Sequence, residues 1–339
     1  MDSESTDDLR LVTLQDVQAA AARIADSCLR TPVLSAGVDL PRLWLKADSL
    51  QPTGAFKLRG ATNAVAVLAA EVRARGVVTH SSGNHGQALA CAAARAGVTC
   101  TVVMPEESVA AKVEATRAWG ATVELVATAE RASTCAAVAE RTGAAFVPPF
   151  DDPSVIAGQG TVGLEILDQL PGVETVLVPV GGGGLISGIA AAVKGLAPHV
   201  RVIGVEPELA ADAAEGMTTG RRTQWPLERT TATIADGLRG SSVGVLNWAH
   251  LQAHVDGILT VAEADSVAAV RAIARRVRLV AEPSGAVSTA AYLAHPDRDS
   301  LGRTVAVVSG GNVDPAAYAG MLNTSSLGAA RTDPRAVSR

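Results

Sequence analysis

Short apolar runs alternate with alanine-rich segments along most of the chain. The runs are typical of strands that are buried on both faces of a parallel sheet. The segments between them have the length and the spacing of apolar residues expected for helices. The alternation therefore predicts an α/β fold, in which helices cover open and mostly parallel sheets. The predicted strands lie within residues 77–80, 100–105, 122–126, 175–180, 200–207 and 304–312.

Capping residues and glycines mark the expected helix ends. Thr13 and Asp16 have the three-residue spacing of a capping box, which predicts a helix that runs to about Ser27. Glycine readily adopts the left-handed backbone conformation that ends many helices. On this basis we expect four glycines to end helices, namely Gly97, Gly120, Gly143 and Gly195.

The length of 339 residues suits two lobes better than one compact domain. The proline-rich segment FVPPFDDP, residues 146–153, is predicted to cross from one lobe to the other. Residues 321–339 have no hydrophobic periodicity and are predicted to form a loose tail.

Composition and charge narrow the function classes. Hydrophobic residues make up 48% of the chain, which is enough apolar material for a large core. The 29 basic and 34 acidic residues give a net charge of -5, which argues against a nucleic-acid or anionic-membrane partner. The four cysteines lack the spacing of a disulfide framework and the acidic N-terminus lacks the pattern of a signal peptide, so we expect a cytoplasmic protein. Residues 175–193 are uncharged, but Pro179 and four consecutive glycines favour a strand, a turn and a helix over a membrane span.

The strongest functional signal is the turn VPVGGGGLISG, residues 178–188. Ligands of parallel α/β folds bind at the carboxyl ends of strands, where such turns lie. Four glycines there leave backbone N–H groups free to surround an anion, and the helix N-terminus adds a positive dipole end. Because glycines cost conformational entropy on folding, a purely structural turn is the weaker interpretation. The spacing matches neither the nucleoside-triphosphate motif nor the dinucleotide motif, so another phosphorylated ligand is expected.

A second turn, THSSGNHGQALA, residues 79–90, joins a predicted strand to a predicted helix. Its hydroxyl, amide and N–H groups at a helix start would suit a carboxylate, whereas an ordinary N-cap needs one such side chain. A zinc site at His80 and His85 is the alternative, but no cysteine or carboxylate completes it.

Lys57 lies in the segment QPTGAFKLRG, among apolar and turn-forming residues. Removal from water lowers the pKa of a lysine, and the neutral amine can then form an imine with a carbonyl group. Such a lysine, combined with a phosphate site and a carboxylate site, points to pyridoxal 5′-phosphate acting on an amino acid.

Seven segments, in order between about residues 13 and 315, resemble the successive motifs of the pyridoxal-phosphate-dependent threonine/serine dehydratases and serine racemases. They are PTGAFKLRGA, SSGNHGQALA, VIAGQGTVGLEIL, PVGGGGLISG, TIADGL, AEPSGA and VVSGGNVD. The resemblance implies the fold-type II, tryptophan-synthase-β-like architecture and a homodimer. It also implies a large cofactor-binding domain of residues 1–75 and 151–320 around a small domain of residues 76–150.

The resemblance also implies a role for individual residues. Lys57 would carry the cofactor as a Schiff base beside Phe56, and Asn84 would hydrogen-bond its phenolic oxygen. Ser309 would meet the pyridine nitrogen, and a hydroxyl there would suit β-elimination or racemisation better than transamination. Backbone N–H groups of five residues would hold the phosphate, namely Gly181, Gly182, Gly183, Gly184 and Leu185.

The substrate and a metal ion are assigned in the same way. Ser81, Asn84 and His85 would bind the substrate carboxylate, and Ser82 matches the racemase residue that faces Cα opposite the lysine. A second set of residues matches a magnesium, manganese or calcium site, for which two carboxylates and a carbonyl are suitable ligands. Without the resemblance, two solvated carboxylates at a strand end would be the simpler interpretation. This set is Glu206, the Ala210 carbonyl and Asp212.

The implied function is that of an ammonia-lyase (dehydratase) for L-threonine, L-serine or a related 3-hydroxy amino acid. Such an enzyme removes the Cα proton, eliminates the β-hydroxyl group and releases a 2-oxo acid and ammonia. A serine racemase is one alternative, if Ser82 returns a proton to the opposite face of Cα. A 3-hydroxyaspartate ammonia-lyase is another. A non-catalytic amino-acid-binding protein would have no need of Lys57.

Overall fold

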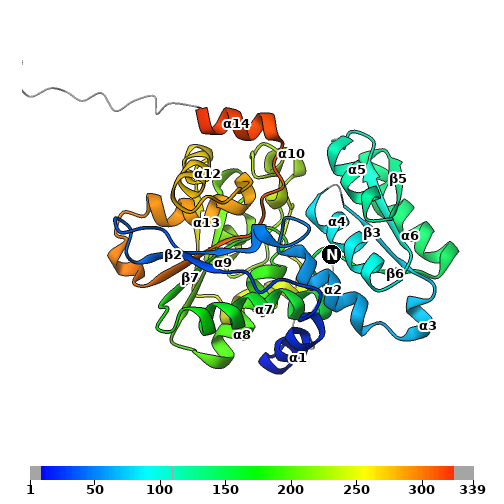
Figure 1. Cartoon of the computed structure of the whole chain (residues 1–339), viewed down its shortest axis with the longest axis horizontal. Coiled ribbons are helices and arrows are strands. Elements are labelled where there is room, and N and C mark those ends of the chain that lie inside the picture. Colours follow the sequence, from blue (N-terminus) through cyan, green and yellow to red (C-terminus); the bar gives the residue numbers. More distant parts are fainter. Residues whose placement is uncertain (1–8, 82, 109, 324–339) are drawn as a thin grey trace, which may run out of the picture.

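The computed structural model describes residues 9–81, 83–108 and 110–323. Its strands form two sheets, and helices cover both faces of each sheet (Figure 1). In the described part of the chain, β1 and β2 run antiparallel and every other pair of neighbouring strands is parallel. The predicted α/β class with mostly parallel, helix-covered sheets is confirmed.

The larger sheet has six strands in the order β1-β2-β10-β7-β8-β9. These strands are β1 (Val33–Ser35), β2 (Leu43–Ala47), β7 (Thr175–Pro179), β8 (Arg201–Pro207), β9 (Gly257–Val261) and β10 (Thr304–Val308). On one face of the sheet lie α12 (Glu263–Val277) and α13 (Pro283–Ala294). On the other face lie α7 (Pro153–Gln169), α8 (Gly184–Leu196) and α11 (Val245–His254), with α1 (Leu14–Ile24) packed on α7 and α8.

The smaller sheet has four strands in the order β5-β4-β3-β6. These are β3 (Val77–His80), β4 (Cys100–Pro105), β5 (Thr122–Val126) and β6 (Ala145–Phe146). Helices α4 (Asn84–Arg95) and α5 (Ala110–Ala118) cover one face, and α6 (Arg131–Thr142) covers the other. Helix α2 (Lys57–Val67) packs against both α4 and α7, and therefore lies between the two sheets (Figure 1). The remaining helices are α3 (Ala70–Arg73), α9 (Asp212–Thr219), α10 (Leu227–Thr230) and α14 (Pro315–Asn323).

The burial of both sheet faces explains why the predicted strands read as continuous apolar runs. In β7, Leu177 packs into the core under α13, whereas Val176 and Val178 pack into the core under α8. A strand with one solvated face would need polar residues at alternate positions instead.

The predicted helix ends are only partly correct. Thr13 and Asp16 form the expected capping box, but α1 ends at Ile24 rather than near Ser27. Three of the four glycines have the left-handed backbone, with φ of +66° at Gly97, +84° at Gly120 and +70° at Gly143.

The fourth glycine, Gly195, does not end a helix, because α8 continues to Leu196. A Cβ atom at Gly195 would lie 2.8 Å from the Cβ atom of Leu14, so the glycine allows α1 to approach α8.

The predicted tail also starts too early. Helix α14 continues to Asn323, so residues 321–323 are helical. Residues 324–339 lie outside the described residues. In the described ranges, no helix is long and apolar enough to cross a membrane.

Candidate active site

Lys57 is the first residue of α2, which begins without a side-chain cap. Its Nζ atom donates a hydrogen bond to the carbonyl oxygen of Pro149, at 2.6 Å, and lies 5.1 Å from the centre of the Phe56 ring. The side chain is half-buried, and the loss of hydration lowers the pKa of Lys57 to about 8. The neutral amine is therefore more abundant near neutral pH than it would be for a hydrated lysine.

Ser309 follows β10 and is buried beside the segment that leads into α2. The Phe56 N–H group donates to the Ser309 carbonyl oxygen at 2.9 Å, and the Gly311 N–H group donates to the Gly54 carbonyl oxygen at 2.9 Å. Two motifs from opposite ends of the chain, PTGAFKLRGA and VVSGGNVD, therefore lie side by side at the carboxyl end of the larger sheet.

The four-glycine turn connects β7 to α8, as predicted. None of the described residues accepts a hydrogen bond from the N–H groups of the turn, Gly181–Leu185. On the opposite side of the turn, the Gly182 carbonyl oxygen accepts hydrogen bonds from the Gly244 N–H group at 3.1 Å and the Asn247 side-chain amide at 2.9 Å. Gly183 has a φ of +91°, a conformation that favours glycine. The turn is thus held through its carbonyl side and offers its N–H groups to an anion.

Residues 149–151 connect the lysine to the glycine turn. The Pro149 carbonyl group binds Lys57, and the Phe150 ring packs so closely on Gly182 that a Cβ atom there would lie 2.2 Å from it. The Asp151 carboxylate accepts the N–H groups of Val245 and Leu246 at the start of α11, at 2.9 and 3.0 Å. The segment runs from β6 in the smaller sheet to α7 on the larger one, which agrees with the predicted crossing.

Asn84 is held from both sides at the start of α4. Its amide nitrogen donates to the Glu282 carboxylate at 2.6 Å, and its amide oxygen accepts from the Asn312 side chain at 2.8 Å. The second N–H of the amide nitrogen stays available for another acceptor. Burial, followed by the charge of Asp236, raises the pKa of Glu282 to about 7.

The structure brings the other predicted carboxylate-binding residues to the same end of the smaller sheet. The Ser81 hydroxyl accepts the Gly83 N–H group at 3.2 Å. The His85 ring is buried, with Nε2 3.0 Å from the Val147 carbonyl oxygen. Burial, followed by the charge of Lys57, lowers the pKa of His85 to about 3, so the ring is neutral. Because the ring donates to Val147, His85 could contact a carboxylate only through its backbone. Ser82 lies outside the described residues.

The three residues of the predicted metal site lie at the end of β8 and the start of α9. Glu206 is buried and accepts the N–H groups of Ala213 and Ala214 at 3.2 and 2.8 Å, and Asp212 accepts the Val243 N–H group at 2.9 Å. Burial raises the pKa of both carboxyl groups, that of Asp212 to about 6, and the charge of Asp212 raises the pKa of Glu206 further.

Neither carboxylate forms an ion pair with a lysine, arginine or histidine in the described ranges. The described residues contain no cluster of three or more His, Cys, Asp or Glu side chains that could hold a metal ion. A cation bound by Glu206 and Asp212 would therefore take its other ligands from the buried Ala210 carbonyl group and from water.

Several residues of the site had no predicted role. Glu282 and Asn312 hold Asn84, and both belong to motifs recognised in the sequence, AEPSGA and VVSGGNVD. The sequence signal for Glu282 and Asn312 was the presence of a polar residue inside an otherwise apolar, glycine-rich motif. Pro149 acts through its backbone and Asp151 through a contact 94 residues away, so neither left a local signal.

Comparisons with known proteins agree with this geometry. A model of the family "Pyridoxal-phosphate dependent enzyme" matches residues 24–310. The chain is 43% identical to an L-threonine ammonia-lyase of Geobacter sulfurreducens, over 88% of this chain and 75% of that protein. It is 40% identical to a beta-hydroxyaspartate dehydratase of Paracoccus denitrificans, over 89% of this chain and 96% of that protein. The crystal structure of a serine racemase from Dictyostelium discoideum matches with a TM-score of 0.84 and 38% identity, covering 89% of this chain and 99% of that one.

Proposed function

The chain belongs to the family of pyridoxal-phosphate dependent enzymes, and on this premise we propose that it is an ammonia-lyase (dehydratase) for L-threonine, L-serine or a related 3-hydroxy amino acid. One observation carries the proposal. A lysine with a lowered pKa, Lys57, is joined through residues 149–151 to a turn whose backbone N–H groups have no acceptor among the described residues. This pairing provides an amine for a carbonyl group and a cradle for a phosphate in one site.

The residues present fit pyridoxal phosphate. The N–H groups of the turn, Gly181–Leu185, would hold the phosphate, and Lys57 would hold the carbonyl carbon beside Phe56. The free N–H of Asn84 would bind the phenolic oxygen, and Ser309 would meet the pyridine nitrogen. When bound, this cofactor would accept the negative charge that develops at the substrate Cα.

The side chains of the site would perform the proton transfers. The Lys57 amine, once released by the substrate, would remove the Cα proton, and its lowered pKa suits a base that works near neutral pH. Ser81, Asn84 and the backbone of His85 would fix the substrate carboxylate and thereby direct the Cα–H bond toward Lys57. The β-hydroxyl group would take up a proton and leave as water, which gives an enamine. The imine tautomer of this enamine would then add water and release ammonia and a 2-oxo acid.

Racemisation is the second candidate, because a serine racemase aligns with 92% of this chain at 38% identity. It would need a group that returns a proton to Cα on the face away from Lys57, and Ser82 is the candidate from sequence. Ser82→Ala should then suppress D-serine formation from L-serine and elimination from D-serine, while elimination from L-serine persists. Equal loss of all three reactions would rule out this role for Ser82.

The buried carboxylates of Glu206 and Asp212, with the Ala210 carbonyl group, would bind Mg²⁺, Mn²⁺ or Ca²⁺ as a structural activator. A cytoplasmic location would suit the four cysteines, all of which are free thiols. The family resemblance supports a homodimer, and it supports a large domain of residues 1–75 and 151–320 around a small domain of residues 76–150.

A substrate panel tests the proposed function. The cofactor-loaded protein would be incubated with L-threonine, L-serine and L-threo-3-hydroxyaspartate, and 2-oxo acid, ammonia and D-amino acid would be measured. We expect equal amounts of 2-oxo acid and ammonia from at least one substrate, and none from Lys57→Ala. Lys194→Ala is the matched control, because Lys194 lies outside the candidate site and pairs with Asp256; this variant should keep wild-type activity. Absence of 2-oxo acid and of D-product with every substrate, from protein that retains cofactor, would contradict the proposal.

A further inference from the structure

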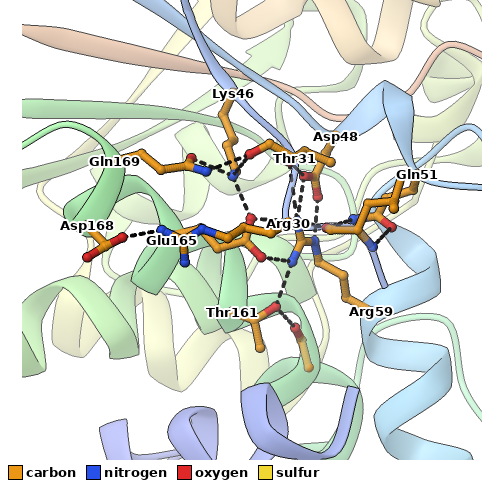
Figure 2. A network of polar contacts seen from close by, with 12 residues as sticks. Arg30, Thr31, Lys46, Asp48, Gln51, Arg59, Thr161, Glu165, Asp168 and Gln169 are labelled. Atoms are coloured by element: carbon orange, nitrogen blue, oxygen red, sulfur yellow. Dashed lines mark hydrogen bonds and ion pairs between the residues drawn. The ribbon is translucent and has the colours of Figure 1, made fainter. Parts of the chain in front are cut away.

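A network of buried charges surrounds Arg59, two residues after Lys57 in the first turn of α2 (Figure 2). It contains two cations, Lys46 and Arg59, and two anions, Asp48 and Glu165. The side chains of Lys46, Asp48 and Arg59 are at most 1% exposed, and that of Glu165 is 13% exposed. The charges balance, and every charged group has a partner of opposite sign, so the network does not call for a ligand.

Arg59 is at the centre of this network. Its guanidinium group donates to both carboxylate oxygens of Asp48, at 2.8 and 2.9 Å, and to both carboxylate oxygens of Glu165, at 2.6 and 2.9 Å (Figure 2). It also donates to the Thr161 hydroxyl at 3.1 Å and to the Leu29 carbonyl oxygen at 3.2 Å. Because the five N–H groups of arginine form a rigid fork, two such carboxylates fix both its position and its orientation.

The two carboxylate partners of Arg59 come from two different elements, the short helix after β2 and helix α7. Asp48 begins the short 3₁₀ helix η2 (Asp48–Leu50) directly after β2, and Glu165 lies on α7. Lys46, the last residue but one of β2, binds Glu165 at 2.5 Å and the Thr31 carbonyl oxygen at 2.6 Å. The network therefore joins α2 to the larger sheet and to α7.

The geometry of a helix couples Arg59 to Lys57. Residues two apart in an α-helix point in nearly opposite directions, so Lys57 faces the site while Arg59 faces the network. In the part of the chain that the structure describes, no side chain caps the start of α2, whose N-cap position is Phe56. The contacts of Arg59 thus restrain the first turn of α2, as an N-terminal capping side chain would otherwise do.

Close packing beside Arg59 strengthens the coupling. A Cβ atom at Gly158 on α7 would lie 2.6 Å from the Arg59 carbonyl oxygen and from the Gly60 Cα atom, so the two helices touch through their backbones. The acceptor of Lys57, Pro149, lies four residues before α7 begins. Helix α7 and the segment that leads into it therefore contact the first turn of α2 on both of its sides.

Stability alone does not account for such a network, because buried ion pairs are often no more stabilising than apolar residues of similar size. What they add is one preferred geometry. We propose that Arg59 is a positioning residue, which fixes the rotation and height of the first turn of α2 and so directs the Lys57 amine toward the cofactor carbonyl carbon. This inference rests on the proposed role of Lys57.

The test compares Arg59→Lys, which keeps the charge but loses the fork, with Arg30→Lys. Arg30 pairs with Asp168 of α7, both side chains are more than half exposed, and neither belongs to the four-residue network, so Arg30→Lys is the matched control. Three quantities would be measured on folded protein: the rate at which pyridoxal phosphate attaches to the apo-protein, the pH titration of the bound cofactor's visible absorption, and kcat and KM. The first two do not depend on which substrate the enzyme uses.

For Arg59→Lys we expect the attachment rate and kcat to fall about tenfold or more, because small misplacements of a reacting group are costly. The absorption titration should shift, while KM stays within about twofold because the carboxylate site lies on α4. Glu165→Gln, which weakens the same fork from the other side, should change the attachment rate, the titration and kcat in the same direction by a smaller factor. Arg30→Lys should match the wild type.

Wild-type attachment, titration and kcat in folded Arg59→Lys, even at a lower melting temperature, would show that the network has only a structural role. Failure of both Arg59→Lys and Glu165→Gln to fold would overturn the inference in the same way. Lys57→Ala separates this failure from a failure of the proposed function. If Lys57→Ala still binds cofactor covalently, the role of Lys57 itself is wrong.

Discussion

Gly182→Ala tests the phosphate cradle through a single methyl group. The Cβ atom would lie 2.2 Å from the Phe150 ring, whereas ordinary contact starts at 3.4 Å, so the ring or the turn must move by about 1 Å. The backbone of Gly182 does not have a left-handed φ, so alanine adds crowding there without backbone strain. The expected effect is thus a displacement of the turn's N–H groups.

The size of the effect follows from the hydrogen bonds at risk. A shift of about 1 Å would lengthen an N–H to phosphate contact beyond hydrogen-bonding distance, and a hydrogen bond to a charged group contributes about 1.5–3 kcal/mol. Loss of one such bond would weaken cofactor binding about 10- to 150-fold. The assay is the dissociation constant of pyridoxal phosphate, measured from its visible absorption across a concentration series.

A second substitution identifies the cause. Phe150→Ala removes the ring that the new methyl group would meet, so Gly182→Ala/Phe150→Ala should bind cofactor more tightly than Gly182→Ala alone. Gly257→Ala is the control, because a Cβ atom at the start of β9 would meet nothing within 4 Å. Binding by Gly182→Ala within twofold of the wild type would refute the assignment of the phosphate to this turn.

Two further predictions concern protons and metal ions. The rate at which pyridoxal phosphate attaches to the apo-protein should rise with pH around a midpoint of about 8, the lowered pKa of Lys57, because only the neutral amine attacks. A midpoint near 10.5, the ordinary pKa of a lysine, would instead show that Lys57 is hydrated. The pKa of Asp212 is raised from 3.8 to about 6, so the native state holds a proton that the unfolded state releases, and stability without metal should fall as pH rises between these values. Added Mg²⁺ or Ca²⁺ should therefore raise the melting temperature more at pH 7.5 than at pH 5, and no increase at either pH would contradict the metal site.

The sequence predicted strand positions best where a strand consists of consecutive apolar and β-branched residues. The strands at 77–80, 100–105 and 122–126 have the predicted bounds. The first two are almost wholly buried, whereas β5 is a partly exposed edge strand that its β-branched and apolar residues still identified. Strands β1, β2, β6 and β9 were not predicted. The sequence of β2, LWLKA, contains Lys46, and a lysine is rarely buried in a central strand. Only the structure shows that Glu165, 119 residues further along the chain, neutralises that lysine.

The candidate site shows the same division. Lys57 and the glycine turn could be found because each carries its chemistry in a few consecutive residues. The contacts that hold them, such as Pro149 with Lys57, Glu282 with Asn84 and Asp48 with Arg59, join separate segments. Such contacts depend on how the sheets and helices pack. The local sequence pattern does not show which distant segments this packing brings together.

Borohydride trapping tests the central claim most directly, because it fixes the cofactor to whichever lysine holds it. The chain contains four lysines, Lys46, Lys57, Lys112 and Lys194, and each can be distinguished by mass spectrometry of its peptide. The protein would be loaded with pyridoxal phosphate, reduced with borohydride and digested. Our account predicts one phosphopyridoxyl group per chain on Lys57, whereas the same group on another lysine, or on none, would contradict it.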